Sequence, residues 1–246
     1  TILRASTTQP TECKDLVAGW PDYIGIVDAS SHGVGGVILG ELSDLPPTVF
    51  RLQWPEYIST DLVSFENRAG KISNSDLEMA GLLLLWLCLE GTAPDLAHKH
   101  VALFSDNSPT VSWVTKMASK KSRVAAQLVR ALALRLNISR SCPLTPVHIP
   151  GVENALTDIP SRSFGSVAEW HCKSDNDLLT LFNSKFPLPN QASWTVFKFD
   201  TRVTTRVISA LRMKGTTLDE WQRLPTTGKY TGQTGPDMSN LWDWTL

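Results

Sequence analysis

The sequence lacks the cysteine pattern of a disulfide-rich or zinc-binding protein. It has four cysteines among 246 residues, and they are scattered: Cys13, Cys88, Cys142 and Cys172. Structural zinc sites and disulfide frameworks both need closely spaced or regularly paired cysteines. We therefore expect reduced thiols in an intracellular protein, located in the cytoplasm or the nucleus and not secreted.

Long apolar runs and targeting segments are also missing. The longest apolar stretch, residues 79–89, is far shorter than the roughly 20 residues that a membrane-spanning helix needs. No basic segment is followed by an apolar run and a small-residue cleavage site, so we expect no secretory signal peptide. These absences predict a protein without a membrane partner.

Net charge is nearly absent, since 23 basic and 24 acidic residues leave a formal charge of −1. The charges are nevertheless unevenly distributed, because no acidic residue occurs between Asp106 and Glu153. The same stretch holds seven basic residues: Lys116, Lys120, Lys121, Arg123, Arg130, Arg135 and Arg140. A local positive excess can bind a phosphate backbone even in a neutral chain. The alternative is a solvated helix surface balanced by acids elsewhere in the fold.

The apolar content of 42% is sufficient for a packed core. Three β-rich runs, 23–28, 34–39 and 48–54, predict an antiparallel meander. Gly35 and Gly36 inside the second run indicate a bulge or the close approach of another backbone. The pattern then predicts, in chain order, helix 75–90, strand 101–105, a helix from Ser108, helix 122–137, strand 144–149 and helix 153–162.

Capping residues define the predicted helix ends. Ser75 is the expected cap of the first long helix, and Gly91 is its expected end. Ser108 is the expected cap of the next helix, with Pro109 at its first helical position. The middle of the first helix is apolar on nearly all sides, which predicts that it is buried.

The order β-β-β-α-β-α-α-β-α predicts an α/β fold with a mixed five-stranded sheet flanked by helices. We divide the chain into a linker (1–22), a catalytic domain (23–165) and a C-terminal extension of unknown role (166–246). Helix 175–185, strand 195–199 and helix 201–214 are the elements predicted in the extension.

Four acidic residues are placed where such a fold would bring them together. Asp28 ends the first strand and Asp106 ends the fourth, while Glu78 lies in the first turn of the buried helix. Asp158 lies near the start of the last helix of the catalytic domain. Carboxylates this close raise one another's pKa unless a cation balances their charge. Oxygen ligands favour Mg²⁺ or Mn²⁺ over zinc, so the pattern predicts metal-assisted phosphodiester hydrolysis.

Each acid also has a structural interpretation. Ser75 and Glu78 fit a capping box, which would leave Glu78 with the role of satisfying the helix end. Asp28 alone would be a turn former, and Asp106 could begin a helix. Asp158 alone would be a surface acid. The order and placement of all four residues favour a site, since no single residue does.

Four segments in this order resemble motifs of retroelement ribonuclease H domains. Residues 28–37 (DASSHGVGGV) resemble their first hairpin, and 77–80 (LEMA) resemble their first helix, whose glutamate binds metal. Residues 104–107 (FSDN), followed by 111–113 (VSW), resemble their fourth strand and the helix after it. Residues 148–162 (HIPGVENALTDIPSR) resemble the segment that closes these domains.

The resemblance covers about residues 23–163 and is typical of retrotransposon polyproteins. It implies a ribonuclease H-like fold and a Mg²⁺-dependent enzyme, in which Mn²⁺ can substitute. The implied reaction is two-metal-ion, endonucleolytic cleavage of the RNA strand of an RNA–DNA hybrid during reverse transcription. The implied catalytic and metal-binding residues are Asp28, Glu78, Asp106 and Asp158. The implied partner is a reverse transcriptase domain of the same polyprotein.

Substrate contacts are expected from two sets of residues. Ser30, the amide of Gly33 and Asn107 are candidates for reading the 2′-hydroxyls of the RNA strand. The basic candidates for holding DNA phosphates are Lys116, Lys120, Lys121 and Arg123.

The closing segment departs from the family in two places. The mobile histidine loop that many cellular ribonucleases H carry before the last aspartate is absent. His148 is expected to be structural, with product release as the alternative role. Pro160 falls where the family has a helix former, so we expect the helix to break or restart there.

A protein without catalytic activity is the main alternative. The chain could be an inactive ribonuclease H-like tether, or a module of a reverse transcriptase that only binds nucleic acid. A tether has no need to keep four like charges together, which favours the enzyme. A metal titration would separate the two, because only the enzyme requires a carboxylate metal site.

Overall fold

The protein is described by a computed structural model. It describes residues 20–40, 45–93, 95–139, 144–166, 170–189, 192–213 and 217–225, together with the backbone of 229–231. Most of the predicted linker, the end of the extension, Cys13, Arg140 and Cys142 lie outside the described residues. Within them, Cys88 and Cys172 are free thiols, as predicted for these two positions.

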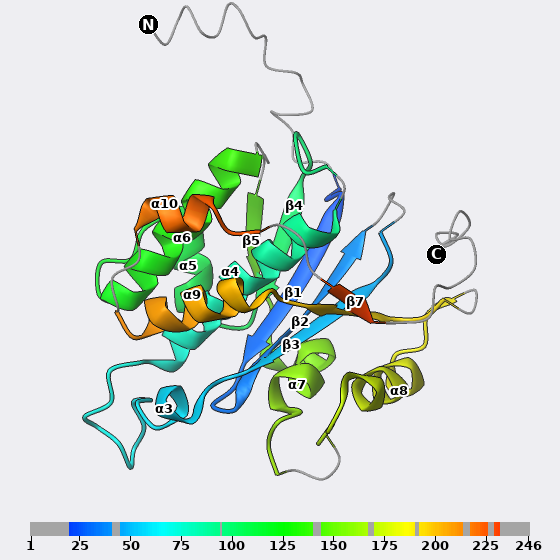
Figure 1. The fold of residues 1–246 in the computed structure, drawn as a ribbon, viewed down its shortest axis with the longest axis horizontal. Helices are drawn as coiled ribbons and strands as arrows, with labels where there is room; N and C mark the ends of the chain where they lie inside the picture. Colours follow the sequence, from blue (N-terminus) through cyan, green and yellow to red (C-terminus); the bar gives the residue numbers. More distant parts are fainter. Residues whose placement is uncertain are drawn as a thin grey trace, which may run out of the picture.

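A single mixed sheet forms the centre of the molecule (Figure 1). Its strands lie in the order β5-β4-β1-β2-β3-β6-β7. Strand β2 is antiparallel to β1 and β3, whereas β4 is parallel to β1 and β5 is parallel to β4. The bounds are β1 Tyr23–Ala29, β2 Gly33–Gly40, β3 Thr48–Gln53, β4 Val101–Ser105, β5 Leu144–His148, β6 Thr195–Lys198 and β7 Lys229–Thr231. The five predicted strands and the mixed sheet are confirmed, and the extension adds two strands.

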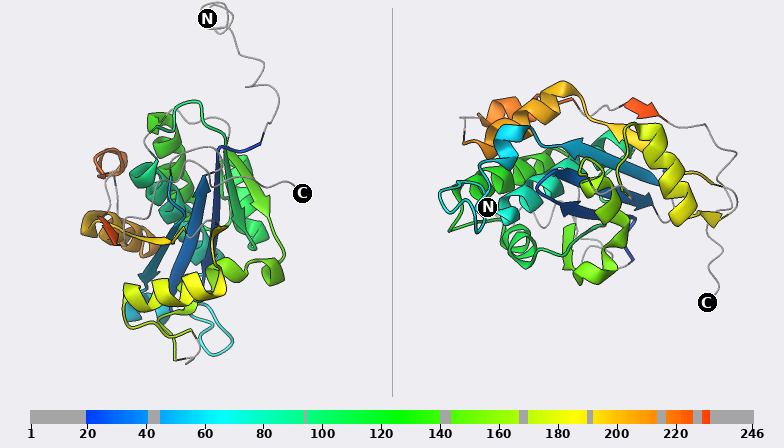
Figure 2. Two further views of the ribbon diagram at one scale, coloured as in Figure 1. Left: turned by 90° about the vertical axis from the view of Figure 1, so that its right-hand side faces the viewer. Right: turned by 90° about the horizontal axis from the view of Figure 1, so that it is seen from below.

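Helices cover both faces of the sheet and enclose two cores (Figure 2). The larger core packs the sheet against α4 (Asn74–Thr92), α6 (Arg123–Ser139), α9 (Thr201–Leu211) and α10 (Leu218–Gln222). The smaller core includes side chains of α7 (Ala155–Arg162) and α8 (Asp175–Lys185) on the opposite face. Two further helices are α3 (Glu56–Ser59), which the sequence did not predict, and α5 (Ser108–Lys116).

Helix α4 is buried as predicted, but its ends differ from the prediction. Its cap is Ser73, whose hydroxyl accepts from the amide of Asp76, while the Asp76 carboxylate accepts from the amide of Ser73. The predicted capping box at Ser75 and Glu78 is therefore wrong, because an equivalent box two residues earlier already satisfies the helix end. The helix also continues through Gly91 to Thr92. Within the described residues, no helix has the length and apolarity to cross a membrane.

Two other helix ends also differ from the prediction. Asn107 rather than Ser108 caps α5, because its side chain accepts from the amide of Thr110; Pro109 lies in the first turn as expected. Helix α7 neither breaks nor restarts at Pro160, and a short 3₁₀ turn, Gly151–Glu153, precedes it. The buried Pro160 packs on β2, and this packing offsets the helical hydrogen bond that proline removes.

The described part of the extension packs directly on the predicted catalytic domain. Strand β6 pairs with β3, and Arg135 on α6 donates to the carbonyl of Trp221 on α10. Arg135 is 1% exposed and pairs with the buried Glu90. Its interpretation as a phosphate-binding residue is therefore wrong, because its charge is already used inside the core. The proposed boundary between catalytic domain and extension stays a prediction.

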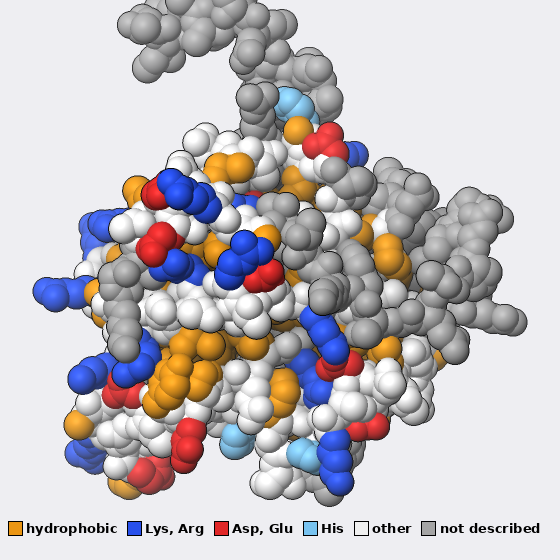
Figure 3. All heavy atoms as spheres, in the orientation of Figure 1, with side chains coloured by type: hydrophobic (Ala, Val, Ile, Leu, Met, Phe, Trp, Pro, Cys, Tyr) orange, Lys and Arg blue, Asp and Glu red, His pale blue; other side chains and the backbone are white. Residues whose placement is uncertain are grey.

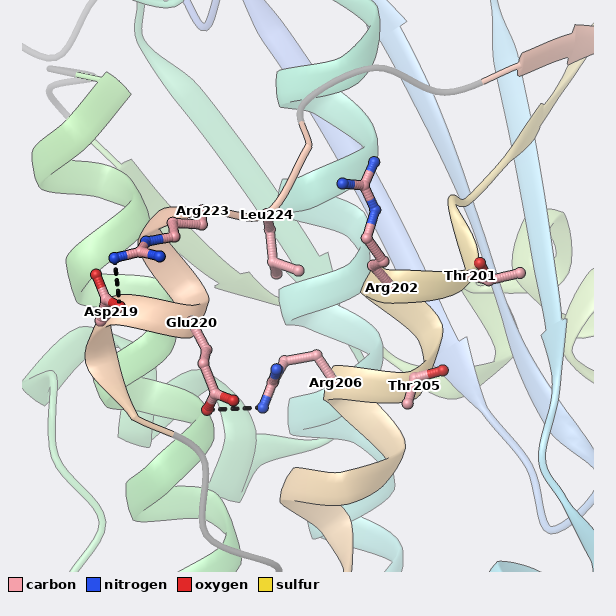
Figure 4. A pocket seen from close by; sticks show the side chains of 8 residues that line it. All are labelled: Thr201, Arg202, Thr205, Arg206, Asp219, Glu220, Arg223 and Leu224. Atoms are coloured by element: carbon pink, nitrogen blue, oxygen red, sulfur yellow. Dashed lines mark ion pairs between the residues drawn. The ribbon is translucent and has the colours of Figure 1, made fainter.

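One ion pair joins α9 to α10 on the outside of the extension, and a second lies at α10 itself. Arg206 on α9 pairs with Glu220 on α10, and Arg223 pairs with Asp219 within α10 (Figure 4). Basic and acidic side chains lie close together on this face of the molecule (Figure 3). Because these positive charges are matched locally, the pocket between α9 and α10 is better explained as a helix contact than as a phosphate site.

Candidate active site

Three of the four predicted acids meet at one end of the sheet. Asp28 lies near the end of β1, Asp106 directly follows β4, and Glu78 lies in the second turn of α4. One carboxylate oxygen from each can be chosen so that all three lie within 4.8 Å of one another. Parallel pairing of β1 with β4 places Asp28 and Asp106 side by side, and the burial of α4 against the sheet supplies Glu78.

Glu78 is the most buried member of this acidic cluster (Asp28, Glu78 and Asp106). Its side chain is 2% exposed, and its Oε1 accepts a hydrogen bond from the amide of Ala29 at 3.2 Å. Its Oε2 is buried without a hydrogen-bond partner. Burial, and then the nearby Asp28 and Asp106, raise the pKa of Glu78 well above its usual value. An unpartnered buried carboxylate oxygen is costly, and a bound cation would remove that cost.

Asp28 is also buried, but it has a hydrogen-bond donor. The hydroxyl of Ser161 on α7 donates to Asp28 Oδ2 at 2.5 Å. Burial raises the pKa of Asp28 to about 6. The Ser161 hydrogen bond opposes this rise, whereas Asp106 and Asp158 add to it. In the absence of a cation, Asp28 therefore releases its proton near neutral pH and not at the low pH of an exposed aspartate.

Asp158 is near the cluster but is bound to a different partner. Its carboxylate pairs with the guanidinium of Arg162 at 2.7 Å, one turn later on α7. Burial raises the pKa of Asp158, Arg162 lowers it, and Asp106 raises it again. These mutual effects place Asp158 within electrostatic range of Asp28 and Asp106. It is not one of the three residues whose oxygens meet within 4.8 Å.

The segment after β5 lies close to Asp106. The ring of His148 is within hydrogen-bond distance of the backbone carbonyl of Asp106, at 3.0 Å through Nε2. A Cβ atom added to Gly151 would lie 3.2 Å from Asp106 Oδ2, so this segment passes close to the carboxylate. His148 thus contacts the strand end that carries Asp106. This contact agrees with a structural role, and a role in product release stays a prediction.

The donor set of the cluster fits a hard divalent cation. All three ligands are carboxylates, which Mg²⁺ and Mn²⁺ prefer and zinc does not require. The unpartnered Glu78 Oε2 and the raised pKa values of Glu78 and Asp28 show that the site is unfavourable when it is negatively charged and empty of cations. The acidic cluster could therefore hold a metal ion.

A cleft lies beside the N-terminus of α4, where two of the predicted basic residues are found. Lys121 and Arg123 line it, whereas Lys116 and Lys120 are exposed but do not. Trp113, half-buried against the core, also lines it. The other lining residues are Val63, Lys71, Ser73, Ser75, Asp76, Pro109, Ser122, Val124 and Met213.

The cleft is close to the acidic cluster in the chain and on the helix. Ser75 lines the cleft and Glu78 follows it by three residues, which places the Cβ atoms of the two residues about 5–6 Å apart on α4.

The three predicted RNA contacts all have partners within the protein. The hydroxyl of Ser30 donates to the carbonyl of Ser161 at 2.8 Å, and the amide of Gly33 donates to that hydroxyl. The side-chain oxygen of Asn107 caps α5, which leaves its amide nitrogen as the group able to donate to a ligand. RNA contacts by these residues stay a prediction.

The sequence analysis missed two features of this region. Ser161 belongs to the closing segment 148–162 (HIPGVENALTDIPSR), but no periodicity or spacing showed that its hydroxyl would reach Asp28 across the fold. Lys71 and Met213 line the cleft from segments that carry no motif. Met213 follows α9, so the extension supplies part of the cleft wall.

No protein family model matches the chain, and no curated protein matches it significantly. Among solved structures, LC11-RNase H1, isolated from compost by a metagenomic approach, is 19% identical with a TM-score of 0.41, covering 56% of this chain and 91% of that chain. The same protein in complex with an RNA/DNA hybrid is 17% identical with a TM-score of 0.37, covering 56% and 92%.

Similarity at this level does not by itself establish a function. The class of the protein rests on the strand order, the strand directions and the helix placement. A β1-β2-β3 meander, with parallel β4 and β5 added beside β1 and helices on both faces, defines a ribonuclease H-like fold. The acidic cluster lies where β1 and β4 end in that sheet.

Proposed function

We propose that this protein is a divalent-metal-dependent endoribonuclease that hydrolyses the RNA strand of RNA–DNA hybrids by a two-metal-ion mechanism. The observation that carries the proposal is the buried Glu78, whose Oε2 has no partner and faces a cluster with Asp28 and Asp106. A buried carboxylate oxygen without a hydrogen-bond partner is costly, and a bound ligand would compensate for the missing hydrogen bond. A structural tether gains nothing from this arrangement.

The residues of this chain have separable roles in the proposal. Asp28, Glu78 and Asp106 would hold the metal, and Asp158, which pairs with Arg162, would act as the fourth carboxylate of the site. A bound Mg²⁺ or Mn²⁺ supplies activation of water and stabilisation of the leaving oxygen. Lys121 and Arg123 hold a backbone phosphate in the cleft.

The substrate class follows from the shape of the hybrid. An RNA strand presents 2′-hydroxyls in a shallow minor groove, and we propose that the side-chain amide of Asn107, whose oxygen caps α5, donates to one of them. The resemblance of the four motifs to retroelement domains supports a place in retroelement reverse transcription, beside a reverse transcriptase domain of the same polyprotein. That context is part of the proposal.

Cleavage of a labelled RNA–DNA hybrid with Mg²⁺ or Mn²⁺ tests the proposal. We expect cleavage of the RNA strand that EDTA abolishes and that Asp28→Asn reduces by several orders of magnitude. Double-stranded DNA should remain intact. The control variant is Glu56→Gln, which removes an exposed carboxylate on α3 and should cleave like the wild type. Tight hybrid binding without cleavage would support the inactive tether instead.

A further inference from the structure

Ser161 forms a hydrogen bond with Asp28 that has no role in the reaction proposed above. It lies on α7, is fully buried, and donates its hydroxyl to Asp28 Oδ2 at 2.5 Å. The same hydroxyl lies 3.2 Å from the carbonyl of Asp158, the ordinary partner for a serine in a helix. A hydroxyl has one proton to donate, and the shorter contact identifies Asp28 as its acceptor.

The backbone of Ser161 is held in place from two sides. Ser30, in the turn between β1 and β2, donates its hydroxyl to the carbonyl of Ser161 at 2.8 Å. On β2, Gly35 lets the helix approach closely, because a Cβ atom there would overlap Ser161 N and lie 2.6 Å from the carbonyl carbon of Pro160. The position of the hydroxyl is therefore fixed by the hairpin and the sheet, and not by α7 alone.

We infer that Ser161 is a positioning residue, which orients the Asp28 carboxylate toward the divalent metal ion of the acidic cluster. The inference rests on the proposed function for the identity of the ligand. A hydrogen bond to one oxygen of a carboxylate restricts rotation of the group and fixes which oxygen faces the cluster. Ser161 acts through Asp28 and does not itself contact the substrate.

Metal affinity measures this role without any need for cleavage. We would titrate the full chain with Mn²⁺ by isothermal titration calorimetry, comparing the wild type with Ser161→Ala and Ser161→Thr. Loss of a hydrogen bond to a metal ligand lowers metal affinity by about 10- to 100-fold, so we expect a loss of that size in Ser161→Ala. Ser161→Thr keeps the hydroxyl and should bind close to wild type.

Ser163→Ala is the matched control. Ser163 is also fully buried and lies just after α7, but its hydroxyl contacts the carbonyl of Pro160 and the guanidinium of Arg51 instead of a carboxylate of the cluster. We expect wild-type Mn²⁺ affinity in this variant, even where its unfolding midpoint in EDTA is lowered. Should Ser161→Ala fail to fold, Ser161→Cys keeps nearly the same shape with a weaker donor and should also lose affinity.

The outcomes separate the inference from the proposed function. Wild-type Mn²⁺ affinity in a folded Ser161→Ala protein would overturn the role of Ser161 and leave the nuclease proposal unaffected. If the wild-type protein binds Mn²⁺ but does not cleave a hybrid, the proposed nuclease activity is wrong. The Mn²⁺ affinities of the wild type and Ser161→Ala would still test the role of Ser161. On an active enzyme, we expect Ser161→Ala to lower kcat at limiting Mn²⁺ with little change in KM for the hybrid, and excess Mn²⁺ to restore kcat.

Discussion

Gly35 lies directly opposite Asp28 in the antiparallel pairing of β1 with β2. Both residues face α7, since the backbone of Ser161 fills the space above Gly35 and its hydroxyl reaches Asp28. Because Gly35 has no side chain, α7 can approach the sheet closely enough for Ser161 to donate to the Asp28 carboxylate.

Gly35→Ala should damage the fold and the candidate metal site together. The added Cβ would overlap the backbone of Pro160 and Ser161, which cannot move without displacing α7. Overpacking of this kind costs about 1–3 kcal/mol, and the displaced Ser161 should weaken Mn²⁺ binding. Urea unfolding and Mn²⁺ titration measure the two effects.

Gly25→Ala is the control for this substitution. The atoms nearest to its Cβ would be side-chain atoms of Leu85 and Leu103, which can shift. We expect unchanged Mn²⁺ affinity in Gly25→Ala. Equal Mn²⁺ affinities in Gly35→Ala and the wild type would show that close packing of α7 has no bearing on the site.

The pKa of Asp28 predicts a pH dependence of stability in the absence of metal. Its pKa is about 6 in the folded protein and 3.8 in its ordinary state. The unfolded chain therefore ionises first, and stability should fall as the pH rises from about 4 to about 6, by up to roughly 3 kcal/mol. Glu78, whose pKa is also raised, should add to this fall.

Denaturant unfolding in EDTA across this pH range measures the fall. Asp28→Asn should reduce it, because asparagine does not titrate. Metal should reverse the trend, since Mn²⁺ competes with protons for the carboxylates and should bind more tightly as the pH rises toward 7. An unchanged slope in Asp28→Asn would contradict the assignment of the fall to this residue.

The first five strands of the sheet and the residues of the acidic cluster could be predicted, because the local sequence determines them. The runs that became β1 and β4 end at Asp28 and just before Asp106, and parallel pairing of the two strands is enough to bring those residues together. Glu78 was correctly placed on the buried helix, but its cap was misassigned. Two overlapping Ser-x-x-acid patterns begin at Ser73 and Ser75, and only tertiary packing selects between them.

The remaining errors come from contacts between segments that are distant in the chain. The burial of Arg135 depends on Glu90 and on carbonyls of α10. Its spacing from Leu128 and Leu132 places it on the buried face of α6, but the sequence did not show which acid would pair with it there. The contact of Ser161 with Asp28 joins residues 133 positions apart. Helix α7 continues through Pro160. Gly35, far away in the chain on β2, leaves room for Pro160 because it has no side chain.

Arg135→Ala should destabilise the protein strongly. Removal of the guanidinium leaves Glu90 buried without its ionic partner and removes the hydrogen bond to the carbonyl of Trp221. Breaking one side of a buried pair costs about 3–5 kcal/mol. Urea unfolding measures the loss, and Arg130→Ala, an exposed arginine on the same helix, should change stability by less than about 0.5 kcal/mol.

Replacing both partners of this buried pair separates two sources of the lost stability, the unpaired charge of Glu90 and the lost contact with α10. Arg135→Met combined with Glu90→Gln removes the unpaired charge, and its stability should be higher than that of Arg135→Ala. If the double variant is no more stable, the loss comes mainly from the contact with α10, and the extension contributes more to the core than the ion pair does.

The cleft predicts which basic residues hold nucleic acid. Lys121 and Arg123 line it, whereas Lys120 is also exposed but does not line it. Lys121→Ala and Arg123→Ala should each weaken binding of a hybrid to the Asp28→Asn protein. Each should also reduce the slope of log affinity against log salt by about 1, because one phosphate contact is lost. Fluorescence anisotropy at several salt concentrations measures both quantities. Lys120→Ala should leave the slope nearly unchanged, and an equal change in all three variants would mean that the local positive charge, and not the cleft, binds the hybrid.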